Sequence, residues 1–165
     1  MLTIISVGQN QTKDENLKTV WPEEYKWKVG SNQEDKTTHF LEIIPGKESI
    51  DKWTMLGTMM SLKNTRILTT NQVVEMYRES SQKESPKSKL TVLEKNDTTK
   101  NIWVLFKVET PSFPNDPKPE SQLYYAIQGE ATLYVTFIAI KEKTLSNDFI
   151  TKWAKVFKNS ELVYQ

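Results

Sequence analysis

The sequence contains no cysteine and only one histidine, His39, and these two shortages exclude several kinds of site. Without cysteine the chain has no disulfide, no thiolate nucleophile and no cysteine-ligated zinc or iron–sulfur centre. A single histidine also rules out any metal site built from several histidines, and it leaves one side chain that ordinarily titrates near neutral pH. The sequence therefore predicts no metal site and no cofactor, and it identifies no catalytic residue.

The chain also lacks an excess of one charge and lacks long apolar runs. Its 22 basic and 21 acidic side chains give a net charge of +1, and the two signs are mixed along the chain. A protein that binds nucleic acid by neutralising phosphates needs a basic excess or a basic face. No segment approaches the roughly 20 apolar residues of a membrane-spanning helix. We therefore expect no nucleic-acid partner and no transmembrane segment.

The first eight residues, MLTIISVG, form a short apolar run, and a polar stretch, QNQTKDENLKT, follows it. The run could be the first strand of the domain. Alternatively, it is the remnant of a secretory signal, because Ser6 and Gly8 supply small residues at the −3 and −1 positions of a cleavage site. We expect residues 1–19 to be a disordered segment outside the core. The second interpretation predicts an exported protein, periplasmic or secreted, and a cytoplasmic location stays open as the alternative.

Residues 20–165 are predicted to form a single α+β domain. Alternation of apolar and polar residues is typical of half-buried strands. It occurs over residues 24–30, 37–44, 89–95, 101–109, 121–128 and 131–140. Gly129-Glu130 suits a tight hairpin between the last two strands. Residues 131–140 are apolar on both faces, which predicts a central strand that is covered on both sides.

Three segments carry apolar residues at helical spacing, over residues 48–62, 69–80 and 144–163. Thr69 and Gln72 have the spacing of a capping box, which favours a helix start. In the last segment an apolar stripe is centred on Trp153, which we expect to be buried in the core. The predicted fold is a central antiparallel sheet of about six strands with helices packed on it, in the order β-β-α-α-β-β-β-β-α.

Two segments within this order of elements carry a resemblance to a known fold. LEIIPGKESIDKW (41–53) and QLYYAIQGEATLYVTFIAI (122–140) resemble the PsbP/Mog1-like α/β/α sandwich and uncharacterised exported bacterial proteins of that shape. The likeness is one of topology and covers about residues 22–160. Members of that fold serve as photosystem accessory subunits, a GTPase-binding factor and envelope proteins, and most are not enzymes. The resemblance therefore implies a non-catalytic role, and no functional residue is carried over because no motif matches.

Four residues are candidates for binding. Trp103, Tyr124 and Tyr134 are chosen because each is expected opposite the main apolar face of its strand. The competing interpretation, which we favour, is that a covering helix buries them. His39 shares a strand face with Leu41, where a histidine is more often a packed structural residue than a catalyst.

Two functions follow from these observations. The first is a non-catalytic exported accessory or binding protein whose partner is an unknown protein or small ligand. The alternative is an enzyme with an unfamiliar site around His39 and a carboxylate such as Glu42.

Overall fold

The computed structural model describes residues 14–165, which form nine β-strands, two α-helices and two short 3-10 helices. Seven strands make one antiparallel sheet in the order β2-β3-β4-β8-β7-β6-β5, and β1 pairs with β9 in a separate two-stranded sheet. The strands are β1 (Glu15–Lys18), β2 (Lys28–Glu34), β3 (Thr38–Ile44), β4 (Met55–Lys63), β5 (Lys89–Asn96), β6 (Trp103–Thr110), β7 (Glu120–Gln128), β8 (Thr132–Ile140) and β9 (Glu161–Tyr164). The helices are α1 (Thr70–Glu84) and α2 (Asn147–Lys158), and the 3-10 helices are Glu23–Tyr25 and Ile50–Lys52.

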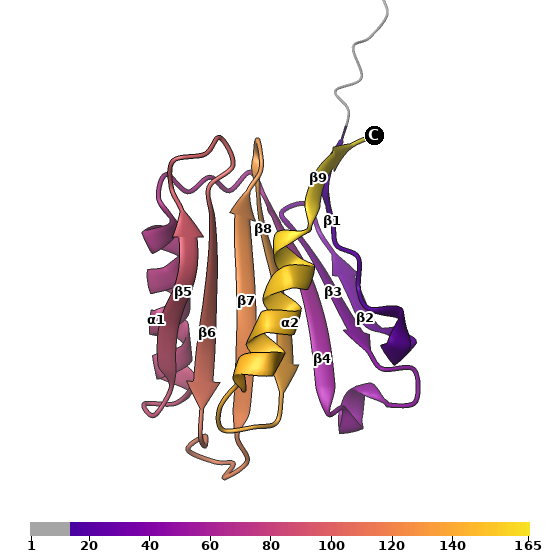
Figure 1. Ribbon diagram of the computed structural model, residues 1–165, viewed down its shortest axis with the longest axis vertical. Helices are drawn as coiled ribbons and strands as arrows, with labels where there is room; N and C mark the ends of the chain where they lie inside the picture. Colours follow the sequence, from indigo (N-terminus) through magenta and orange to yellow (C-terminus); the bar gives the residue numbers. More distant parts are fainter. Residues whose placement is uncertain (1–13) are drawn as a thin grey trace, which may run out of the picture.

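The two α-helices lie on opposite faces of the seven-stranded sheet, as Figure 1 shows, so the molecule has three layers. Alternate residues of each strand therefore supply two separate cores. On the α1 side, Val73 and Val74 of the helix pack against Val104, Phe106 and other inward residues of the sheet. On the α2 side, the helix packs against a second set of buried sheet residues. Strand β8 is fourth of seven and buried on both faces, so the prediction of a covered central strand is confirmed.

Aromatic side chains dominate the core beneath α2, and Trp153 lies at its centre with none of its surface exposed. The rings of Trp21, Tyr25, Trp27 and Phe157 have centroids 5.6–6.1 Å from the Trp153 ring. Ser146 starts the helix, because its Oγ accepts a hydrogen bond from the Phe149 N–H at 3.2 Å. The predicted burial of Trp153 is confirmed.

The predicted fold class is wrong, although the antiparallel sheet with helices is confirmed. Strands account for 44% of the described residues and helices for 22%, and the large sheet has seven strands. The predicted helix over 48–62 is instead the 3-10 helix followed by β4. The C-terminal helix ends at Lys158, and residues predicted to continue it form β9. The helical pattern misled at β4 because apolar residues occur on both of its faces, which also produces spacings of three and four.

The segment predicted to lie outside the domain also needs correction where the structure describes it. Residues Glu15–Lys18 form β1, which pairs with β9 near the C-terminus. The Glu15 carboxylate accepts hydrogen bonds from the hydroxyls of Tyr134 and Tyr164 at 3.1 Å and from the Glu130 N–H at 2.9 Å. The predicted signal remnant or strand at residues 1–8 lies outside the described residues. Within the described chain, no helix is long and apolar enough to cross a membrane.

A substitution at Gly57 tests how β4 packs against its neighbours. A Cβ atom at this position would lie 2.7 Å from the Trp21 ring and 2.9 Å from Ile43. Valine favours strands over glycine by up to about 1 kcal/mol. Overpacking a filled core costs about 1–3 kcal/mol, so the steric effect dominates. We expect Gly57→Val to lower the free energy of unfolding by about 1–3 kcal/mol in urea titrations.

The same substitution in a Trp21→Ala background serves as the control. Removing the indole opens space above Gly57, so the penalty of Gly57→Val should shrink in the double mutant. An equal penalty in both backgrounds would contradict the packing of Trp21 on Gly57.

Candidate functional site

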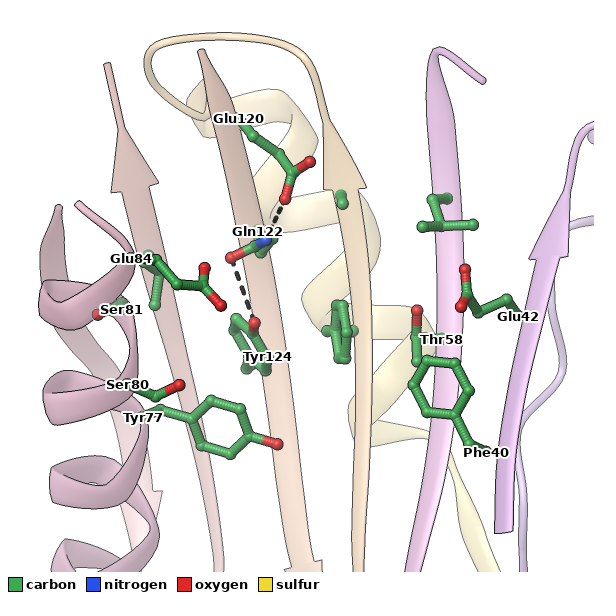
Figure 2. Close-up of a pocket in the computed structure, with 14 residues that line it drawn as sticks. Phe40, Glu42, Thr58, Tyr77, Ser80, Ser81, Glu84, Glu120, Gln122 and Tyr124 are labelled. Atoms are coloured by element: carbon green, nitrogen blue, oxygen red, sulfur yellow. Dashed lines mark hydrogen bonds between the residues drawn. The ribbon is translucent and has the colours of Figure 1, made fainter. Parts of the chain in front are cut away.

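The sheet face beneath α1 is only partly covered by the helix. Helix α1 packs on β5 and β6, and the same face continues uncovered by a helix over β7, β8, β4 and β3 (Figure 2). A cavity of about 300 Å³ lies between the helix and β3, and we call it the α1 groove. Its lining comprises Tyr77, Ser80, Ser81 and Glu84 of α1, Val108 of β6, Glu120, Gln122 and Tyr124 of β7, Phe137 and Ala139 of β8, Leu56 and Thr58 of β4, and Phe40 and Glu42 of β3.

Side-chain hydrogen bonds hold both ends of α1 and so position the helical wall of the groove. At the N-terminal end the Asp97 carboxylate accepts from the Thr70 N–H at 2.7 Å and from the Thr70 hydroxyl at 3.0 Å. The predicted capping box between Thr69 and Gln72 is confirmed. Beyond the last turn, the Ser85 hydroxyl donates to the carbonyl of Ser112 at 2.7 Å. The helix is thereby attached to the loops at both ends of β6.

The inner end of the groove is aromatic. The Tyr124 ring stacks on Phe106 with centroids 4.9 Å apart and on Phe137 with centroids 4.5 Å apart. The ring of Tyr77, which comes from α1, has its centroid 4.8 Å from that of the Tyr124 ring. These contacts extend a continuous ring surface from the core into the groove.

A hydrogen-bonded row of three side chains follows β7 along the groove. Glu120, Gln122 and Tyr124 alternate along the strand and therefore share one face. The Gln122 amide donates to Glu120 and accepts from the Tyr124 hydroxyl at 3.2 Å (Figure 2). Because Gln122 both donates and accepts, its orientation fixes the positions of the other two groups.

Three carboxylates, those of Glu42, Glu84 and Glu120, stand around the groove. Burial raises the pKa of Glu120, and the neighbouring Glu84 raises it further, while the Gln122 hydrogen bond and Lys141 act in the opposite direction. Burial alone raises the pKa of Glu42. In both residues desolvation penalises the charged form, which is the usual consequence of placing a carboxylate beside apolar surface.

The two tyrosines of the groove stay protonated at neutral pH. Burial raises the pKa of Tyr77 to about 12. The pKa of Tyr124 lies well above its ordinary value, because of burial and of the nearby Tyr77 and carboxylates. These phenols are therefore hydrogen-bonding groups rather than bases. In the described chain no cluster of three His, Asp or Glu side chains could hold a metal ion.

Of the residues proposed from the sequence, Tyr124 lies in the α1 groove, whereas His39 and Tyr134 lie together on the opposite face of the sheet. They line two adjoining hollows of about 130 and 630 Å³ beside β1. The larger hollow exceeds the α1 groove in volume, but four of its polar lining residues already pair with one another: Tyr134 with Glu15 at 3.1 Å and Lys63 with Glu34 at 2.7 Å.

The geometry does not join His39 to Glu42. These residues occupy odd and even positions of β3, so their side chains lie on opposite faces of the sheet. His39 Nε2 is instead 2.8 Å from Asn32 Oδ1, on the neighbouring strand β2. The carboxylate named with His39 therefore belongs to the α1 groove.

Trp103 lies apart from both sites. It is half-buried at the α2 side of β6, where its ring is 5.9 Å from that of Tyr125. The Lys158 ammonium lies 5.6 Å from the Trp103 ring centroid. This position packs the indole at the margin of the second core.

Sequence reasoning missed Tyr77, Glu84, Glu120 and Gln122 as members of a site. One signal for them exists, because Glu120 and Gln122 precede Tyr124 at alternating positions of a strand whose middle part, residues 123–127, is apolar or aromatic. Polar side chains facing inward on a central strand are uncommon without a structural or functional reason. The helical residues have no comparable signal, since their position depends on where α1 crosses the sheet.

Comparison with known proteins gives no relative from which a function could be transferred. No protein-family model matches the chain, and no curated protein matches it either. The function therefore has to be inferred from the groove itself.

Proposed function

We propose that the protein is a non-catalytic binding protein and that its ligand occupies the α1 groove. The observation that carries this proposal is the half-covered sheet face, which leaves a cavity of about 300 Å³ with apolar and aromatic surface and convergent polar groups. Ligand sites in proteins commonly have volumes of about 300–1,000 Å³ and this mixture of surfaces. The cavity is at the small end of that range, which favours a small ligand.

The groups in the groove support binding better than catalysis. A general base or nucleophile must be poised near the working pH or activated by a neighbour. The phenols of Tyr77 and Tyr124 have raised pKa values, so they are poor bases at neutral pH. Burial also raises the pKa of Glu42 and Glu120, but in the described chain neither carboxylate is hydrogen-bonded to a lining serine or threonine hydroxyl that it could activate. The alternative, an enzyme around His39, has less support because Glu42 lies on the other face and the His39 ring already pairs with Asn32.

We also propose that the protein resembles the PsbP/Mog1-like sandwich in its fold. What supports it is the three-layer arrangement, with α1 and α2 on opposite faces of an antiparallel sheet. An accessory or binding role is common in that fold and agrees with the groove. Export is proposed from the sequence of residues 1–8 alone.

An NMR titration with three one-ring compounds tests the binding function. Benzylammonium, benzyl alcohol and benzoate have similar shapes and differ in charge. We expect at least one of them to cause saturable amide shifts at Tyr77, Gln122 and Ala139, because these residues line the groove. Ser80→Phe should abolish those shifts, since Ser80 is an exposed lining residue and a phenyl ring there fills the cavity.

Gln82→Phe is the matched control, because Gln82 is exposed on the same helix and does not line the groove. It introduces the same phenyl ring two positions away and should leave the shifts unchanged. The proposal is contradicted if none of the three compounds causes saturable shifts in the groove, or if Ser80→Phe binds as the unaltered protein does.

A further inference from the structure

We infer that the ligand of the α1 groove is a small organic ammonium ion with an apolar body. This inference rests on the proposed function and names the ligand class of the same site. Two independent features lead to it. The first is the cavity with its aromatic surface, and the second is a set of carboxylates that the described chain does not neutralise.

None of the 14 lining residues is lysine, arginine or histidine. The ion pairs of residues 14–165 include neither Glu42 nor Glu84 nor Glu120. Lys141 influences Glu120 through space, but its ammonium lies 4.3 Å from the centroid of the Trp53 ring. Glu42 and Glu120 are half-buried, whereas Glu84 is exposed. A half-buried carboxylate without an ion partner carries a desolvation cost, which a bound cation offsets.

The aromatic residues complement such a cation. Ammonium groups are attracted to the faces of Phe and Tyr rings within about 6 Å of the centroid. In Figure 2, Phe40 and Glu42 lie together on the β3 wall of the groove, and Tyr77 and Glu84 lie together on the α1 wall, with Glu120 on the neighbouring strand β7. On either wall, a cationic head can therefore lie beside a ring and a carboxylate at the same time.

The remaining surface selects against other ligand classes. An anion would approach three carboxylates of like charge, which is unfavourable at close range. A metal ion would need a cluster of ligands that residues 14–165 do not form. Leu56, Phe137 and Ala139 offer apolar contact for the body of the ligand. An ammonium ion with an apolar body meets all of these surfaces favourably.

The test measures the dissociation constants of benzylammonium, benzyl alcohol and benzoate by NMR at pH 7, where the amine is protonated. We expect benzylammonium to bind in the groove about tenfold more tightly than benzyl alcohol, with benzoate weakest. Glu120→Gln should remove about tenfold of the benzylammonium affinity and leave that of benzyl alcohol nearly unchanged. Glu42→Gln, on the opposite wall, should act in the same direction.

Glu79→Gln is the matched control, because Glu79 is exposed on α1 and does not line the groove. It should leave all three affinities unchanged, and an amide spectrum of each variant verifies its fold. If benzyl alcohol binds in the groove as tightly as benzylammonium, the inference about charge is overturned while the binding function stands. Equal losses of affinity in Glu79→Gln and Glu120→Gln would also overturn it. If no compound binds in the groove, the proposed function itself fails.

Discussion

Trp153→Ala should give a protein that unfolds cooperatively but is much less stable, or one that is insoluble. The Trp153 side chain is fully buried and contacts the rings of Trp21, Tyr25, Trp27, Phe149 and Phe157. Truncating a buried tryptophan costs about 3–5 kcal/mol, from lost transfer free energy and the cavity left behind. That is a large share of the roughly 5–15 kcal/mol that stabilises a domain. Urea unfolding followed by circular dichroism measures the change.

Two further variants provide a comparison for the stability loss expected of Trp153→Ala. Trp153→Phe keeps a ring in the core and removes the indole Nε1, which has no hydrogen-bond partner in the described structure. Trp153→Phe should therefore lower the free energy of unfolding much less than Trp153→Ala does. The phenyl ring keeps part of the packing, and the substitution also removes an unsatisfied buried donor. His39→Ala should cost far less, because His39 is only half-buried on β3. A thermally silent Trp153→Ala would contradict the central role of the indole in this core.

We expect the protein to lose stability steeply above about pH 10, as buried tyrosines ionise. Burial raises the pKa of Tyr77 and Tyr125 to about 12. Burial also raises the pKa of Tyr124 and Tyr134, helped by nearby carboxylates. The unfolded chain ionises near pH 10, whereas the folded chain holds these protons to higher pH. The stabilisation is therefore complete below about pH 10 and is lost as pH rises through about 12.

Each shift of about two pKa units corresponds to at most about 2.7 kcal/mol of free energy of unfolding. Urea unfolding at several pH values between neutrality and about pH 12 measures the loss. Tyrosinate absorbance should appear together with unfolding. Tyr77→Phe and Tyr125→Phe should each make the loss of stability less steep, because one proton fewer distinguishes the two states. Ionisation of these phenols near pH 10 in the folded protein would contradict their burial.

Local patterns predicted the elements whose surroundings are simple. Strand β8 is apolar on both faces and the α2 stripe is strongly one-sided, so both were recognisable from residue spacing alone. Strand β4 was not, because apolar residues on both of its faces also recur at helical spacing, and Gly57 did not by itself indicate a strand. In the structure the glycine makes room for Trp21, a residue 36 positions earlier in the chain. A contact between distant residues overrode the local pattern.

The candidate site was likewise only partly predictable from local patterns in the sequence. Tyr124, chosen from its position on a strand, lies in the α1 groove, and Glu42 was named beside a residue on the other face of the sheet. His39 and Glu42 are three residues apart, but the pleat of β3 sends their side chains to opposite faces. Glu84 and Glu120 line the same groove only because α1 packs on the sheet face that Glu120 occupies, and no spacing in the sequence encodes that arrangement.

Residue types and local periodicity were enough to establish what chemistry the protein could not use and which segments would be buried. Absence of cysteine, the single histidine, the balanced charge and the Trp153 stripe all belong to this level. The three-dimensional arrangement was needed to show that β1 joins β9, that β4 is a strand, and that α1 leaves half of a sheet face open. Each of these outcomes depends on which distant surfaces bury one another most completely, and local alternation of residues does not contain that information.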